Sequence, residues 1–173
     1  MVVVCAGLSR LGPIPRGEAV RPGPPVASIT TVLHTGLLLR LGMAHPTAAA
    51  PFTSLFTGDR LRTGRGQRTA ILLQDGSQFL LDENTDLGIA FPILRLYHGE
   101  IFGRVPHSGA RHAVVRTDAA VAAVQGTAFD VRAGPPGHPD LTVLTVVSGT
   151  VSLSNPRGSV LVGCTGWLGH PCD

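Results

Sequence analysis

The sequence predicts an all-β protein, most simply a single antiparallel β-sandwich or jelly-roll-like domain, with an irregular β-helix as the alternative architecture. First, within short apolar segments, hydrophobic residues recur at every second position, which is the period of a strand. Second, the 173 residues include 22 glycines and 14 prolines, which is too many for long helices. Third, 43% of the residues are hydrophobic and 14% are charged, which suffices for one buried core.

Residues 1–25 are expected to form a Pro/Gly-rich N-terminal arm or signal-peptide remnant, followed by one β domain over residues 26–168 and a C-terminal tail over residues 169–173. The chain begins with an apolar run that is too short to span a membrane. This run is either a processing remnant or disordered tail, or an extended segment that completes the sheet of another subunit. The strand-donation candidates are Val2, Val3, Val4, Cys5 and Ala6.

The β domain is expected to consist of strands joined by glycine-containing turns. The Asp75-Gly76 pair between two apolar runs is the strongest hairpin signal, because both positions tolerate positive φ. Residues 118–125 are alanine-rich but span only two helical turns, so a strand is preferred over a helix. Three further hairpins are predicted from an apolar run, a polar residue, a glycine and a second apolar run, centred on Gly36, Gly99 and Gly149.

The charge pattern does not favour nucleic-acid binding. All 14 basic residues are arginines, and the one local cluster consists of Arg60, Arg62, Arg65 and Arg68. No aromatic residue interleaves this cluster, although stacking aromatics or a recognisable module are typical of nucleic-acid surfaces. In a strand, Arg60 and Arg62 would share one exposed face.

Cysteine and histidine spacing gives no clear metal site. Cys164 and Cys172 are close enough in sequence to form a disulfide in an oxidising compartment, or they are two unpaired thiols. A zinc site at Cys164, His170 and Cys172 would need further ligands, and the seven histidines show no His-x-His cluster. We therefore expect no metal and no other cofactor.

The sequence also lacks the usual signs of an enzyme. It contains no nucleophile elbow, phosphate loop or dinucleotide fingerprint. Asp82, Glu83 and Asp86 crowd one predicted turn, where capping and solvation explain them. A non-enzymatic protein whose partner is another protein, or a second copy of itself, is the better prediction.

An ordered series of short motifs resembles the FecR domain family over residues 26–168. It includes Gly58-Asp59-Arg60-Leu61-Arg62-Thr63-Gly64, then the Asp-Gly-Ser turn, and later Gln125-Gly126-Thr127-Ala128-Phe129-Asp130-Val131. These residues have roles in fold geometry, and Phe129 is expected to point inward. The fold-signature residues are Gly58, Asp59, Thr63, Gly64, Asp75, Gly76, Gly99, Gly126, Thr127, Phe129 and Gly149.

The resemblance implies an extracytoplasmic sensor or protein-interaction module of the bacterial cell envelope. A full-length FecR regulator also has a cytoplasmic segment that binds a sigma factor, a transmembrane helix and a receptor-contacting part. No stretch of this sequence qualifies as an integral membrane segment, so we do not expect this polypeptide alone to signal across a membrane. The alternative is a structural subunit that assembles into an extracellular filament, because weakly charged strand edges are poorly protected against pairing.

Overall fold

The computed structural model describes residues 23–107, 113–134 and 140–163, and every regular element in these ranges is a β-strand. The all-β prediction is therefore confirmed. The strands are β1 (Ala27–Leu33), β2 (Leu37–Leu39), β3 (Thr47–Ala48), β4 (Ser54–Leu55), β5 (Arg60–Arg62), β6 (Arg68–Leu73), β7 (Gln78–Leu81), β8 (Asp86–Ala90), β9 (Ile93–Val105), β10 (Ala113–Arg116), β11 (Val121–Ala133), β12 (Thr142–Asn155) and β13 (Gly158–Gly163).

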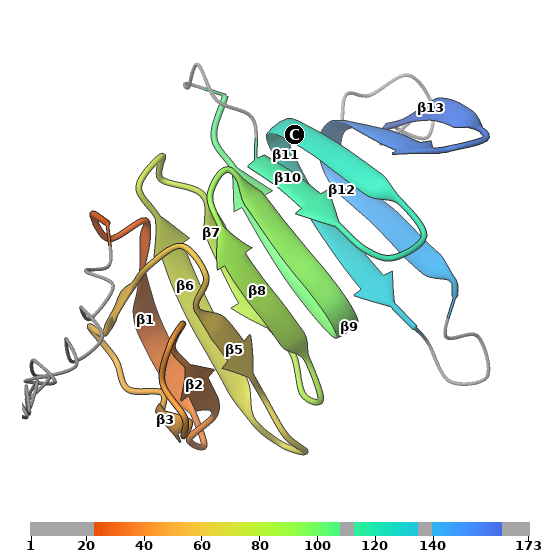
Figure 1. Cartoon of the computed structure of the whole chain (residues 1–173). Coiled ribbons are helices and arrows are strands. Elements are labelled where there is room, and N and C mark those ends of the chain that lie inside the picture. Colours follow the sequence, from red (N-terminus) through yellow and green to blue (C-terminus); the bar gives the residue numbers. More distant parts are fainter. Residues whose placement is uncertain (1–22, 108–112, 135–139, 164–173) are drawn as a thin grey trace, which may run out of the picture.

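All of these strands belong to one hydrogen-bonded sheet (Figure 1). Its main path runs β13-β12-β11-β10-β9-β7-β6-β1-β4, and β2, β3, β5 and β8 form a branch that joins at β9. Every pairing is antiparallel except that of β9 with β10, which is parallel. The predicted antiparallel arrangement therefore holds with this single exception among the described strands.

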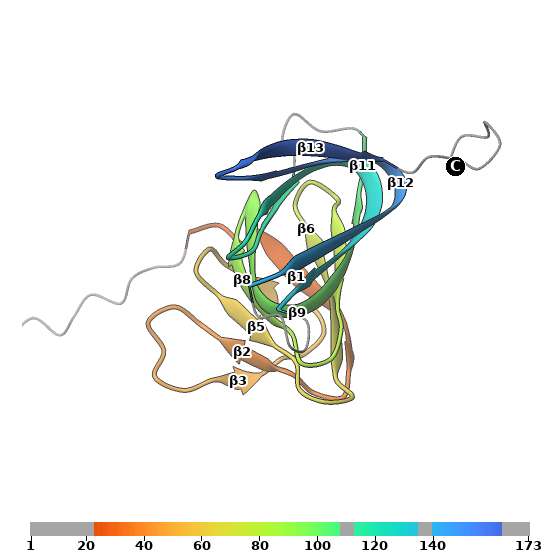
Figure 2. The ribbon, with the colours of Figure 1, turned by 90° about the vertical axis from the view of Figure 1, so that its right-hand side faces the viewer.

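The three longest strands bend and take part in two layers of the sheet. The first half of β9 pairs with β8 and β10, whereas its second half pairs with β7 and β11. Positive-φ glycines lie within these strands, at Gly99 (φ 95°), Gly126 (φ 62°) and Gly149 (φ 80°). Strands that change layers at bends are a known way to build a sandwich from continuous strands. Figure 2 shows how the sheet curls around its interior.

The hairpins predicted at Gly36, Gly99 and Gly149 are wrong. Gly99 and Gly149 lie inside β9 and β12, and β1 and β2 on either side of Gly36 pair with different strands. A single positive-φ residue bends a strand without reversing it, whereas a hairpin needs a complete turn. Glycine is required at 99 because a Cβ there would lie 2.5 Å from the Cα of Thr85.

The hairpin predicted at Asp75-Gly76 is confirmed. It joins β6 to β7, and the backbone N–H of Leu73 donates to the carbonyl of Ser77 at 2.8 Å. Gly76 has a φ of 84°, and the carboxylate of Asp75 accepts the N–H of Ser77 at 2.9 Å. Gly76 thus supplies the backbone conformation, and Asp75 the side-chain acceptor, that a tight turn uses.

The core lies between the two layers. Phe79 and Phe129 meet edge to face, with ring centroids 6.2 Å apart. Both rings lie over Gly103, where a Cβ would be 2.6 Å from one ring and 2.8 Å from the other. The strand preferred over a helix at residues 118–125 is confirmed for residues 121–125, which begin β11, whereas residues 118–120 form the loop that precedes it. One face of the bent sheet is therefore buried in the core, and the other face is exposed.

Candidate protein-docking surface

The outward face of β6, β7 and β9 carries apolar side chains that no described element covers. Alternation along β7 directs Phe79 and Leu81 into the core, so Leu80 points outward and is 41% exposed. Phe102 of β9 is opposite Leu80 in the register and is 37% exposed. We call this surface the outer-face patch, and its side chains are those of Ala70, Leu72, Gln78, Leu80, Phe102 and Arg104.

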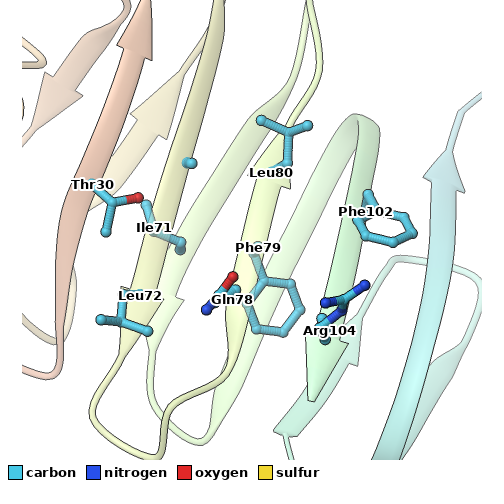
Figure 3. A pocket seen from close by; sticks show the side chains of 9 residues that line it. Thr30, Ile71, Leu72, Gln78, Phe79, Leu80, Phe102 and Arg104 are labelled. Carbon is cyan, nitrogen blue, oxygen red and sulfur yellow. The ribbon is translucent and has the colours of Figure 1, made fainter. Parts of the chain in front are cut away.

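The outer-face patch encloses a shallow hollow of about 320 Å³ (Figure 3). Leu72, Leu80 and Phe102 supply its apolar margin, and Thr30 of β1 lies at its far side. Gln78 and Arg104 face each other across β7 and β9 and add polar groups at one end. An apolar hollow with a polar margin on an exposed sheet face is typical of a surface that receives a partner's side chain.

Arg104 and Asp130 give the outer-face patch its electrostatic character. Within the described ranges Arg104 has no ionic partner, whereas Arg132 donates from Nε to Glu100 at 2.7 Å. Asp130 lies opposite Phe102 in the register of β9 and β11. Its pKa is raised to about 6, first because the carboxyl is partly buried and then because Glu100 is negatively charged and hydrogen-bonded to it. A cation thus stands at one end of the patch and an easily protonated carboxyl beside it.

A second polar cluster lies on β5, β8 and the first half of β9. Asp86 is buried, with 4% of its side chain exposed, and it accepts hydrogen bonds from Arg60 Nη2 at 2.8 Å and Arg62 Nε at 2.6 Å. The centroid of the Tyr97 ring lies 3.8 Å from the guanidinium carbon of Arg60 and 4.9 Å from that of Arg95. The prediction that Asp86 is a solvated turn residue is wrong, because β8 begins there and pairs with β5. These groups satisfy one another and tie three strands together.

The fold-signature residues around β5 hold turns. The carboxylate of Asp59 accepts the N–H of Phe56 at 3.0 Å. Asp59 directly follows Gly58, which has a φ of 95°. The hydroxyl of Thr63 accepts the N–H of Thr85 at 2.9 Å, and the N–H of Gly64 donates to the side chain of Gln67 at 2.6 Å. Asp59 and Gly64 therefore hold turns of a few residues, and Asp59 also pairs with Arg40 at 3.2 Å, whereas Thr63 ties the end of β5 to the start of β8, 22 positions along the chain.

The remaining signature residues lie at the bends and in the core. At Gly149 a Cβ would be 2.5 Å from the methyl carbon of Thr127 and 2.6 Å from the carbonyl oxygen of Gly126. Phe129 is fully buried. The signature residues are thus dispersed over turns, bends and core, and they do not converge on one site. The disulfide candidates Cys164 and Cys172, and the strand-donation candidates Val2, Val3, Val4, Cys5 and Ala6, lie outside the described residues.

Two further observations concern residues 23–107, 113–134 and 140–163 only. No helix there has the length and apolarity needed to cross a bilayer. No three His, Cys, Asp or Glu side chains in these ranges are grouped as a metal ion would require.

Sequence reasoning missed the outer-face patch. The only local signal is an apolar residue at a strand position where alternation predicts an exposed, polar side chain, as at Leu80 and Phe102. Such residues are common singly on protein surfaces, and only the register places these two opposite each other.

Comparison with known proteins identifies the family. The family described as FecR protein matches residues 59–152. Two crystal structures of a proposed anti-sigma factor from Parabacteroides distasonis ATCC 8503, at 1.65 and 2.50 Å resolution, are similar to this chain, each with a TM-score of 0.52 and 22% identity. Each match covers 60% of this chain and 50% of the other, so the match spans half of that protein's length, and at this identity the likeness concerns the fold. No curated protein matches the sequence. Because the family match covers more than half of the residues, this chain belongs to the FecR family.

Proposed function

We propose that this chain is a non-enzymatic, extracytoplasmic protein-interaction module of a bacterial cell-envelope signalling system, and that it binds its partner through the outer-face patch. Membership of the FecR family supports a signalling or sensor role. The described crystal structures are of a proposed anti-sigma factor, which is in keeping with a protein partner. The observation that carries the proposal is an apolar hollow on the sheet face that the described elements leave uncovered.

The chemistry of the patch suggests the kind of segment that it binds. The hollow bordered by Leu72, Leu80 and Phe102 has room for one bulky apolar side chain. Arg104 is exposed beside it and has no ionic partner within the described ranges. A charge-assisted hydrogen bond to a carboxylate would fix the orientation of such a segment. The partner is therefore expected to present an apolar side chain with an Asp or Glu close to it.

Site-specific photocrosslinking in the natural host tests this proposal. A photoreactive phenylalanine analogue is placed at Phe102 or, as a matched control, at Leu41, which is 70% exposed on the loop after β2 and does not line the hollow. We expect one envelope protein to be crosslinked at position 102 and not at position 41. The crosslinked protein should bind the purified chain, and Arg104→Glu should weaken that binding by about tenfold or more. Equal crosslinking at both positions, or binding unaffected by Arg104→Glu, would contradict the proposal.

The location is tested separately by gene fusions. Alkaline phosphatase is active only after export, whereas β-galactosidase is active only in the cytoplasm. We expect the phosphatase fusion of the natural gene to be active and the β-galactosidase fusion to be inactive. The reverse pattern would place the protein in the cytoplasm. The division into an arm over residues 1–25, a domain over residues 26–168 and a tail over residues 169–173 stays a prediction.

The alternative function is a structural subunit that assembles through strand edges into an extracellular filament. The observation in its favour is β13, which is the last strand of the sheet and is apolar and exposed. A filament needs head-to-tail pairing with the other end of the sheet. That end is β4, which has only two paired residues and so offers a short template. Strand donation by residues 2–6 also stays a prediction.

A further inference from the structure

The terminal strand β13 has none of the usual protections of a sheet edge. It pairs with β12 on one side and with no described strand on the other. Its sequence Gly-Ser-Val-Leu-Val-Gly contains no charged residue and no proline. Natural sheets usually guard such edges with charges, prolines or bulges, because alternate N–H and C=O groups of an edge strand point outward and are free to pair.

The exposed side chains of β13 are apolar on both faces. Leu161 is 74% exposed and Val160 is 57% exposed. Val160 is opposite Leu153 in the register with β12, so Val160 and Val162 share the face on which Val151 is buried. Leu161 lies on the other face. Figure 2 shows β13 at the margin of the curled sheet, beyond β12.

The sequence of β13 is symmetric about its centre. Residues 159–163 read Ser-Val-Leu-Val-Gly, so an antiparallel copy centred on Leu161 places Val160 opposite Val162 of the second copy. The same two-fold axis places the two Leu161 side chains opposite each other. Because the axis passes midway between the two Leu161 residues and stands perpendicular to the sheet, each side chain stays on its own face. The valines of both copies then lie on the core-facing side of the joined sheet, and the two leucines contact each other on the opposite side.

We propose that β13 pairs antiparallel with β13 of a second copy, so that two chains form one continuous sheet in a closed, symmetric dimer. This inference does not depend on the proposed function. An isologous contact of this kind uses the edge of both chains and therefore ends in a dimer and not in a filament. A six-residue edge is a small interface, so the dissociation constant is expected on the order of 10–100 µM.

Sedimentation velocity of the full chain tests the dimer over a range from about 10 µM to about 1 mM, which brackets the expected constant. A reducing agent is present throughout, so that disulfides between chains do not contribute. We expect a monomer–dimer equilibrium in the wild type and at least about a tenfold weakening in Leu161→Lys, because two like charges would face each other. Leu41→Lys is the matched control, since Leu41 is 70% exposed but distant in sequence from the edge, and it should dimerise like the wild type.

The symmetry is tested by charge reversal. Leu161→Glu alone should weaken dimerisation by a similar factor of about ten or more, whereas an equimolar mixture of L161K and L161E chains should form heterodimers, because opposite charges then meet across the axis. A wild type that stays monomeric at the highest concentration, or a dissociation constant that is the same in Leu161→Lys as in the wild type, would overturn the proposal. A mixture that fails to associate while the wild type dimerises would overturn the register centred on Leu161.

Discussion

Asp130 is expected to destabilise the folded protein at neutral pH. Its carboxyl is half-buried on the outer face, close to Glu100, and its pKa is raised from 3.8 to about 6. The folded state therefore holds this proton more tightly than the unfolded chain does. Between pH 4 and pH 6 the native state binds more protons than the unfolded state, so stability falls as the pH rises through this window.

The size of this effect follows from the pKa. A change from 3.8 to about 6 corresponds to a ceiling of about 3 kcal/mol, since each pKa unit is worth 1.36 kcal/mol. Asp130 is partly exposed to solvent, which screens its interaction with Glu100. We therefore expect a cost of about 1–2 kcal/mol above pH 7. Asp130→Asn keeps the size of the side chain and removes the charge.

Urea denaturation of both proteins at a series of pH values from about 4 to 8 measures the effect. We expect Asp130→Asn to exceed the wild type in stability by about 1–2 kcal/mol at pH 8 and to match it near pH 4, where Asp130 is protonated in the native state. The control is Asp118→Asn, since Asp118 is 67% exposed and forms a 3.1 Å pair with Arg95, and it should change stability by less than about 0.5 kcal/mol. A gain that does not vary with pH, or a loss at pH 8, would refute the reasoning.

Three further substitutions test the core and the buried carboxylate of Asp86 by the same denaturation assay. Gly103→Ala should cost about 2–3 kcal/mol, because its Cβ would overlap two buried rings, whereas Gly23→Ala, where a Cβ meets nothing within 4 Å, should be nearly neutral. Asp86→Ala should cost about 3 kcal/mol because it leaves two arginines without their carboxylate. Asp118→Ala, at an exposed pair, should cost far less. Similar costs would mean that burial of the Asp86 carboxylate does not strengthen its ion pairs. Phe129→Ala should cost about 4 kcal/mol, and a cost below about 1 kcal/mol would show that its ring is not a core element.

Where the sequence sufficed, the deciding interactions are local. Strand alternation predicts the buried positions, because successive side chains point to opposite faces whatever the partner strand is. The Asp75-Gly76 turn follows from the positive φ that Gly76 adopts and from the Asp75 carboxylate, which accepts the N–H two residues further on. The ordered motifs also sufficed to predict the FecR family, since they serve turns and bends that any member of the fold must make.

Tertiary structure decided everything that depends on which strands are neighbours. Gly99 follows the same local pattern as a hairpin glycine, and only pairing with β7, β8, β10 and β11 makes it a bend within one strand. Asp86 looks like a turn residue until β5 brings two arginines to it. The outer-face patch exists because Leu80 and Phe102, 22 positions apart in the chain, share one register position. Such contacts depend on long-range pairing, and neither the two-residue period nor a turn motif carries that information.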